Sequence, residues 1–443
     1  MRFLGNRLAM MIGIVLLLVV AGFVFAPVVA NQLSAPQPTA DPTAALAGSV
    51  PSAKGYTDRT VLQMQQRAAN DPKDYMALSS LGIAYLQKAR ETNDPTFYTQ
   101  AEQALNKSLA LKPDYYDTIS ALGSLELSRH QFAKALDWGV KAKTLNPHKA
   151  SAYGVIGDAQ IELGKYEDAV STFQQMVDLR PDLSSYARVS YARELYGDMP
   201  GAIEAMTQAV DAGSPAAENT AWTRVQLGNL YLNSKQLDKA ETEYRHALTD
   251  YPNYLHALAG LAAVKAARGE TDEAVNFYKQ SLAIVPLPQY LTALGDLYTV
   301  KGDSKSADEQ YNLVLYIYKL FETNGVNAGI EKAAFLADRG QSPDEAIKLA
   351  EEAAKERTDV HTQDSLAWAL YRGGRYVEAL AAEKQAMRLG TQNALFFYHA
   401  GMIYDKMGDR GNARTNLQKA LDINPHFNLL HAKEASDVLS RLK

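Results

Sequence analysis

The feature that most constrains the fold is an alanine that recurs ten times at intervals of 33 to 39 residues. A second column, of small residues, lies twelve residues earlier in most copies. Self-similarity at a period of about 20–50 residues is the signature of proteins built from stacked supersecondary units. An elongated repeat array is therefore expected. The alanines are Ala101, Ala135, Ala169, Ala202, Ala240, Ala274, Ala307, Ala346, Ala379 and Ala413.

The stretch Leu227–Pro252 shows why small and large residues stand at fixed offsets. Gly228 and Ala240 lack bulk, so two helices can cross closely there, while Tyr231 and Tyr244 can fill the space beside them. The proline that ends the stretch blocks continuation of the second helix. Each unit therefore predicts a helical hairpin. A single hairpin cannot bury its apolar face, so stability must come from stacking on neighbours.

This order of residues, Leu-Gly-x-x-Tyr in a first helix and then Ala, an aromatic residue, Ala and Pro in a second, resembles the tetratricopeptide repeat (TPR). The resemblance covers residues 75–425. It implies an all-α fold, a right-handed α-solenoid of about ten TPR hairpins. It also implies an extended concave surface, lined by the first helices, that takes other proteins or peptides.

Several units depart from the pattern. Seven extra residues, 90–96, fall in the turn of the first hairpin. An irregular joint is expected at 321–346, which would divide the array into seven and three units. Glu383 stands where the ninth unit calls for an aromatic residue. Capping helices are expected at 57–71 and 429–442, because the ends of a solenoid need polar outer faces.

The N-terminal residues differ in kind from the repeats. Residues 8–30 carry no charge, and at about 1.5 Å per residue they reach roughly 35 Å, enough to cross a bilayer core of about 30 Å. We expect a transmembrane signal-anchor, because the apolar run exceeds the roughly 7–15 residues of a cleaved signal peptide. Secretion after cleavage near Ala30 is the alternative.

The charges around this span predict its orientation. Arg2 and Arg7 precede it, so residues 1–7 are expected in the cytoplasm and the rest of the chain outside the cytoplasmic membrane. Residues 31–55 are rich in Pro and Ala and predict a flexible tether. The solenoid is then expected over 56–443.

Composition excludes several classes of protein. A net charge of −5 without long like-charge runs argues against nucleic-acid binding, and the absence of cysteine excludes disulfides and thiolate chemistry. No phosphate loop, dinucleotide fingerprint, zinc-protease motif or nucleophile elbow occurs. We therefore expect no catalytic residue, cofactor or metal, and no enzyme activity. His426 and His431 are interpreted as surface histidines, and carboxylate pairs such as Glu351–Glu352 as solvated helix faces.

A binding groove is expected along the first helices. Asn can pair with both donors and acceptors of a peptide backbone, and Tyr and Trp offer large contact areas with a polar tip. For Trp222 and Trp368 the alternative is packing between repeats. Positions such as Ser79 and Val225 lack the lysine with which some family members grip a C-terminal carboxylate, so that activity is not predicted. The candidates are Asp158, Tyr191, Trp222, Asn229, Asn233, Asp296, His361, Trp368, Tyr371 and Tyr398.

The repeats and the expected anchor together favour a non-enzymatic scaffold at the outer face of a bacterial cytoplasmic membrane. Such a scaffold would recruit or assemble envelope or secretion proteins through its groove. Two other hypotheses stay open. One is a secreted or anchored binder of a glycan or small ligand, because tyrosines can stack on sugar rings. The other is an accessory subunit of an enzyme complex whose catalytic residues lie in a partner chain.

Overall fold

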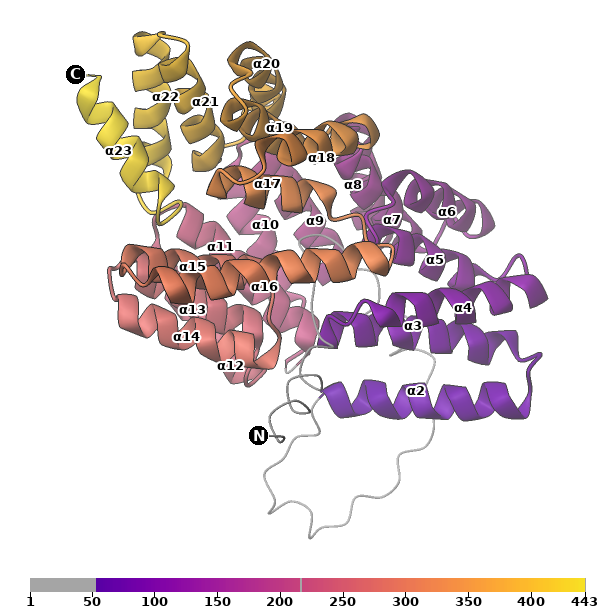
Figure 1. The fold of residues 1–443 in the computed structure, drawn as a ribbon. Coiled ribbons are helices and arrows are strands. Elements are labelled where there is room, and N and C mark those ends of the chain that lie inside the picture. Colours follow the sequence, from indigo (N-terminus) through magenta and orange to yellow (C-terminus); the bar gives the residue numbers. More distant parts are fainter. Residues whose placement is uncertain (1–52, 216, 443) are drawn as a thin grey trace, which may run out of the picture.

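The computed structural model describes residues 53–215 and 217–442 of the 443-residue chain (Figure 1). The segments expected to precede the repeats, 1–7, 8–30 and nearly all of 31–55, lie outside the described residues. Within the part of the chain that is described, no helix is both long enough and apolar enough to cross a membrane.

The described residues form 22 α-helices, α2 to α23, with one short 3-10 helix and no strand. Twenty of the helices pair into ten hairpins, which we number one to ten along the chain. Hairpins one to five are α3 (Tyr75–Thr92) with α4 (Thr96–Leu111), α5 (Tyr116–Ser128) with α6 (Phe132–Leu145), α7 (Ala150–Glu162) with α8 (Tyr166–Leu179), α9 (Leu183–Leu195) with α10 (Met199–Asp211), and α11 (Glu218–Asn233) with α12 (Leu237–Asp250).

The remaining hairpins complete an all-helical, TPR-like solenoid. Hairpins six to ten are α13 (Leu255–Ala267) with α14 (Thr271–Ile284), α15 (Pro288–Val300) with α16 (Ser304–Thr323), α17 (Gly329–Arg339) with α18 (Pro343–Glu356), α19 (Val360–Arg372) with α20 (Tyr376–Ala386), and α21 (Ala394–Lys406) with α22 (Arg410–Ile423). The 3-10 helix η3 (Met387–Leu389) extends α20.

Two single helices flank the hairpins. α2 (Ala53–Asn70) packs against α3, and α23 (His431–Arg441) packs against α22. They lie where capping helices were expected, although α2 begins within the stretch interpreted as a tether. α23 keeps few apolar residues, and three of them, Ala435, Val438 and Leu439, are buried against hairpin ten.

Local signals explain where helices begin and end. Asp182 starts α9, because its carboxylate accepts hydrogen bonds from the backbone amides of Ser184 and Ser185. Asp409 starts α22 in the same way, through the amide of Asn412. Between α7 and α8 the turn contains Gly164 at a φ of 70°, a left-handed conformation that glycine adopts without a steric penalty.

The small-residue columns bring the two helices of a hairpin together. Every residue of the alanine column is at most 2% exposed. A Cβ added to Gly157 would lie 2.2 Å from the ring of Phe173, and one added to Gly228 would lie 2.5 Å from the ring of Tyr244. Both rings come from the position four residues after the column alanine. The expected repeat register is therefore confirmed at these positions.

The segment expected as an irregular joint is well packed. α16 is 20 residues long and α17 only 11, so the hairpin geometry changes here. The side chains of Phe321, Val326 and Ala333 are nevertheless at most 4% exposed. They belong to a hydrophobic cluster that continues from α16 through α19, so the apolar core runs across the change in helix length without a break.

The solenoid closes on itself. The turns of the early hairpins contact the loops that precede the late ones, and the contacting residues are 192 to 197 positions apart. In Figure 1 the orange helices α17 to α19 overlap the purple and magenta α8 to α10, and the bond between Val360 at the start of α19 and Tyr166 at the start of α8 joins the two groups. We call this line of contacts the seam. It joins His130 to Asn327, Glu162 to Arg357, Tyr166 to Val360, Leu195 to Thr391 and Leu232 to Asn424.

Candidate functional site

A cavity of about 370 Å³ lies where the concave face of hairpins three to five meets the next turn of the solenoid. α7, α9 and α11 supply one wall. The start of α19, the loop before α21 and the residues after α22 supply the other. The main polar and aromatic lining residues are Asp158, Arg188, Tyr191, Glu194, Trp222, Gln226, Asn229, Asn233, His361, Gln392, Asn393, Asn424 and Phe427.

Six of the ten groove candidates meet at this cavity. Five of them come from the first helices of three successive hairpins, because equivalent positions of stacked repeats project toward the same concave face. The sixth, His361, comes from α19 on the opposite wall, and its ring lies 5.4 Å from that of Phe396. The six are Asp158, Tyr191, Trp222, Asn229, Asn233 and His361.

The structure places the other four candidates away from the cavity. Asp296 is 4% exposed and forms an ion pair with Arg339 at 2.7 Å. Trp368, Tyr371 and Tyr398 are at most 8% exposed and lie in contact with one another. Their expected accessibility is wrong, because hairpins eight and ten and α23 pack over these rings. Trp368 therefore follows the alternative interpretation, packing between repeats.

Asp158 and Arg188 form the polar floor of the cavity. The Arg188 guanidinium donates to both carboxylate oxygens of Asp158, at 2.8 and 2.6 Å, and to the backbone carbonyl of Ser184. Gly154 leaves the necessary room, since a Cβ there would lie 3.2 Å from the guanidinium. Asp158 and Arg188 are both buried, and each is the ion-pair partner of the other. They therefore give the floor a fixed shape and leave little charge for a ligand.

Glu194 is the acidic group that faces the cavity without such a pair. Its side chain is partly buried, and among the described residues its carboxylate makes no hydrogen bond or ion pair. Burial raises the pKa of Glu194 to about 7. Tyr191 lies nearby, and burial together with surrounding carboxylates raises its pKa as well. A cation or a hydrogen-bond donor entering the cavity would therefore find an acceptor at Glu194.

Amide side chains dominate the remainder of the lining. Asn229 is held in place, because its Oδ1 accepts from the Tyr244 hydroxyl at 2.8 Å. Asn233 is exposed at the rim. Gln392 lies in the loop before hairpin ten and Asn424 in the loop after it, and the repeat pattern contains no signal for them. Apart from His361, sequence reasoning missed this second wall because it exists only once the solenoid has closed.

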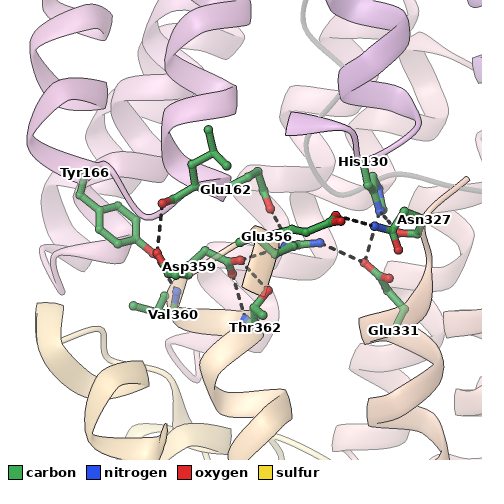
Figure 2. A network of polar contacts seen from close by, with 12 residues as sticks. His130, Glu162, Tyr166, Asn327, Glu331, Glu356, Asp359, Val360 and Thr362 are labelled. Carbon is green, nitrogen blue, oxygen red and sulfur yellow. Dashed lines mark hydrogen bonds and ion pairs between the residues drawn. The ribbon is translucent and has the colours of Figure 1, made fainter. Parts of the chain in front are cut away.

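A buried ionic network beside the cavity holds the two walls together (Figure 2). Arg357 contacts Glu162 at 2.5 Å, Asp359 at 3.0 Å and Glu331 at 3.8 Å. It also lies over the ring of Phe132. Figure 2 shows Glu162 on one side of the seam and Asp359 and Glu331 on the other. One guanidinium thus forms ion pairs with three carboxylates, which come from different turns of the solenoid.

The balance of acidic and basic groups in this network shifts the pKa values of its carboxyl groups. Burial, reinforced by the neighbouring acids, outweighs the attraction of Arg357 and raises the pKa of Glu162 to about 8. Burial would also raise the pKa of Asp359, but the Arg357 charge and hydrogen bonds from Thr362 bring it below its ordinary value. Because the cluster has more acids than cations, the pKa of Glu162 is displaced upward, toward the neutral form.

One expectation about titratable residues needs correction. His431 is 5% exposed, and its Nε2 lies 3.1 Å from a carboxylate oxygen of Asp338, so it is not a surface histidine. His426 is exposed, as expected. Glu352 of the pair Glu351–Glu352 is exposed, as expected, whereas the single carboxylates of Glu162 and Glu383 are at most 5% exposed. Interhelical and seam contacts bury these groups, and helical periodicity cannot reveal such contacts.

Comparison with known proteins identifies the repeats. Models of the tetratricopeptide repeat match residues 150–183, 225–287 and 394–427. These segments cover hairpins three and ten and most of hairpins five and six. The chain therefore carries tetratricopeptide repeats, and this fold is generally a scaffold for protein–protein interaction.

Two curated bacterial proteins are similar to part of the chain. Cellulose synthase operon protein C of Pseudomonas fluorescens (strain SBW25) is 24% identical over 217 residues, which is 46% of this chain and 15% of that protein. Cellulose synthase 1 operon protein C of Komagataeibacter xylinus is 29% identical over 162 residues, 34% of this chain and 12% of that protein. The chain thus spans only a small part of the length of these relatives.

A solved structure is also similar to part of the chain. It is the crystal structure of a thermophilic TPR protein of Thermus thermophilus, with a TM-score of 0.39 and 21% sequence identity. The match covers 43% of this chain and 99% of that one.

Proposed function

We propose that the protein is a non-enzymatic interaction scaffold that binds a short segment of a partner protein in the cavity between hairpins three to five and the next turn of the solenoid. One observation carries the proposal. First helices of three successive repeats direct Asp158, Tyr191 and Asn229 into a single cavity. Repeats of this kind generally serve protein–protein interaction.

The chemistry of the lining suits a peptide. Amides such as Gln226, Asn233 and Asn393 offer donors and acceptors to a peptide backbone. Trp222 and Phe427 offer apolar contact area for a side chain. Because the second wall covers the concave face, the cavity suits a chain end or a short loop better than a long helix.

The proposed location is the outer face of the cytoplasmic membrane, with residues 8–30 as the anchor and the partner an envelope or secretion protein. Support comes from the uncharged run and from Arg2 and Arg7 before it. Protease treatment of spheroplasts tests this topology. The repeats should be digested from outside without lysis, whereas protection until lysis would overturn the proposed orientation.

Site-specific photo-crosslinking tests the binding site. A photoreactive residue at Asn233, on the exposed rim, should crosslink to one recurrent partner segment in growing cells. The same residue at Tyr316, which is 45% exposed on α16, is the matched control and should not. Trp222→Ala should abolish the Asn233 crosslink while the protein remains folded. Equal crosslinks from Asn233 and Tyr316 would refute the assignment.

A small ligand or glycan is the second candidate, favoured by the size of the cavity. A volume of about 370 Å³ falls in the range of about 300–1,000 Å³ typical of small-molecule sites. The two similar bacterial proteins are named after cellulose synthase operons, so cello-oligosaccharides are the first glycans to test. Saturable binding in calorimetry that Trp222→Ala removes would favour this candidate over the peptide.

A further inference from the structure

Hairpins nine and ten enclose a cluster of three titratable side chains that lies outside the cavity and the seam. Asp364 comes from α19, Glu383 from α20 and His399 from α21. All three are at most 5% exposed. One ligand atom of each lies within 4.8 Å of those of the other two.

The cluster replaces what the repeat normally puts there. Glu383 follows the column alanine by four residues, the position that Phe173 and Tyr244 fill with rings in hairpins three and five. A ring at this position packs against the small residue of the first helix. The ninth hairpin instead buries a carboxylate, which forfeits apolar contacts and costs desolvation free energy.

The hydrogen bonds of the described residues leave the cluster incomplete. His399 Nδ1 lies 2.7 Å from an Asp364 oxygen, a hydrogen bond. Both oxygens of Glu383 and Nε2 of His399 are buried without a hydrogen-bond partner in the described structure. Buried polar atoms without partners are rare in folded proteins, and a bound ion is one of their recognised explanations. Three such atoms in one cluster therefore point to a ligand.

We propose that Asp364, Glu383 and His399 bind a divalent transition-metal cation, with zinc as the ion that fits best. Two carboxylates and a neutral imidazole carry a charge of −2, which a dication balances. Zinc takes carboxylate oxygen and imidazole nitrogen and is four-coordinate in closed structural sites. Both Glu383 oxygens, one Asp364 oxygen and one His399 nitrogen could supply four donors, and bonds of about 2.0–2.2 Å require these side chains to draw together around the ion.

The site would be structural. It lies inside the array, where Trp368 stacks on His399 with the ring centroids 4.2 Å apart. The cation would tie α19, α20 and α21 together and so fix the angle between hairpins nine and ten. The competing arrangement is a proton shared between the two carboxyls. Burial and the Asp364 carboxylate raise the pKa of Glu383 well above its ordinary value, which is compatible with that arrangement.

Metal analysis of the full chain distinguishes a bound zinc ion from a proton shared between the two carboxyls. Protein purified without chelator from zinc-supplemented cells should contain stoichiometric zinc by mass spectrometry. EDTA treatment should lower its Tm, and added ZnCl₂ should restore it. Cobalt(II) exchanged into the site should give visible d–d absorption. A chain without bound metal, whose Tm responds to neither EDTA nor ZnCl₂, would overturn the proposal in favour of a protonated cluster.

A variant and a control make the result specific. Glu383→Gln keeps the size of the side chain and can donate to Asp364, so the protein should fold but lose its zinc and its response to EDTA. Glu352→Gln, at an exposed position of α18, should retain both. Zinc that persists in Glu383→Gln would show that the metal is bound elsewhere and would refute this site. The outcome does not depend on whether the cavity binds a partner.

Discussion

Arg357 donates to Glu162 at 2.5 Å although the two residues are 195 positions apart. Glu162 ends the first helix of hairpin three, and Arg357 precedes hairpin nine. In an open solenoid each repeat would meet only its neighbours. The contact therefore records the closure of the solenoid, and it lies beside the candidate site because the same closure brings the cavity walls together.

Replacement of Arg357 tests how much the seam contributes to stability. Arg357→Met should lower the free energy of unfolding by about 3–5 kcal/mol, because it leaves buried carboxylates without their cation. Urea unfolding followed by circular dichroism measures the loss. Arg375→Met is the control, since this half-exposed arginine pairs with Glu351 and Glu378 and should change stability by no more than about 1 kcal/mol. Equal effects would show that the seam adds little.

A second test concerns the close helix crossing in hairpin three. Gly157→Ala places a methyl group where the buried ring of Phe173 lies 2.2 Å away, and overpacking of this kind should cost about 1–3 kcal/mol. Gly329→Ala is the matched control at the start of α17, where the nearest atom lies 3.6 Å away. It should be neutral or stabilising by up to about 1 kcal/mol. Thermal unfolding measures both, and a larger loss in Gly329→Ala would contradict the packing argument.

Glu194 makes stability depend on pH. Its folded pKa of about 7 lies above the ordinary 4.5, so its carboxyl favours folding fully below about pH 4.5, and this contribution is lost as pH rises through 7. Glu194→Gln remains neutral and should be more stable than the wild type at pH 8, by on the order of 1–3 kcal/mol after allowance for its partial exposure. The difference should shrink toward pH 5 in urea titrations. A difference independent of pH would contradict this assignment.

His431 should show a different pH window. Burial alone would lower its pKa, but the hydrogen bond to Asp338 and the Glu434 carboxylate 3.8 Å from its Nδ1 raise it to about 9. Its contribution is therefore fully present below about pH 6.5 and is lost as pH rises through 9. His431→Gln should increase hydrogen exchange of α23 at pH 6 and have a much smaller effect above pH 9. His426→Gln, at an exposed position, is the control and should leave hydrogen exchange of α23 unchanged at both pH values. Equal effects of the two variants would contradict a stabilising contact between His431 and Asp338.

The hairpins could be predicted from the sequence because their contacts are local. Gly157 meets Phe173 sixteen residues later in the same hairpin, and this offset recurs in unit after unit. The first wall of the cavity follows from the same register, which is why Asn229 and Tyr191 were found. These predictions needed only helical periodicity and the size of side chains.

The second wall and the seam could not be predicted in the same way. Small rotations between neighbouring repeats accumulate over six hairpins before Thr391 reaches Leu195, and no single residue encodes their sum. Trp368 and Tyr398 were misplaced for a related reason. Their positions resemble groove positions, but hairpins eight and ten and α23 cover them, and Asp338 accepts a hydrogen bond from Trp368 Nε1 at 2.8 Å.

The closed solenoid has a consequence for how this chain can evolve. Repeat proteins commonly gain and lose units by duplication and deletion, since copy number alters their length and little else. Here the loss of hairpin six would shift the later hairpins by one unit, so that Glu162 and Leu195 would face residues that never evolved opposite them. The seam joins residues from hairpin two to the end of hairpin ten, so copy number over that interval should be fixed among close homologues.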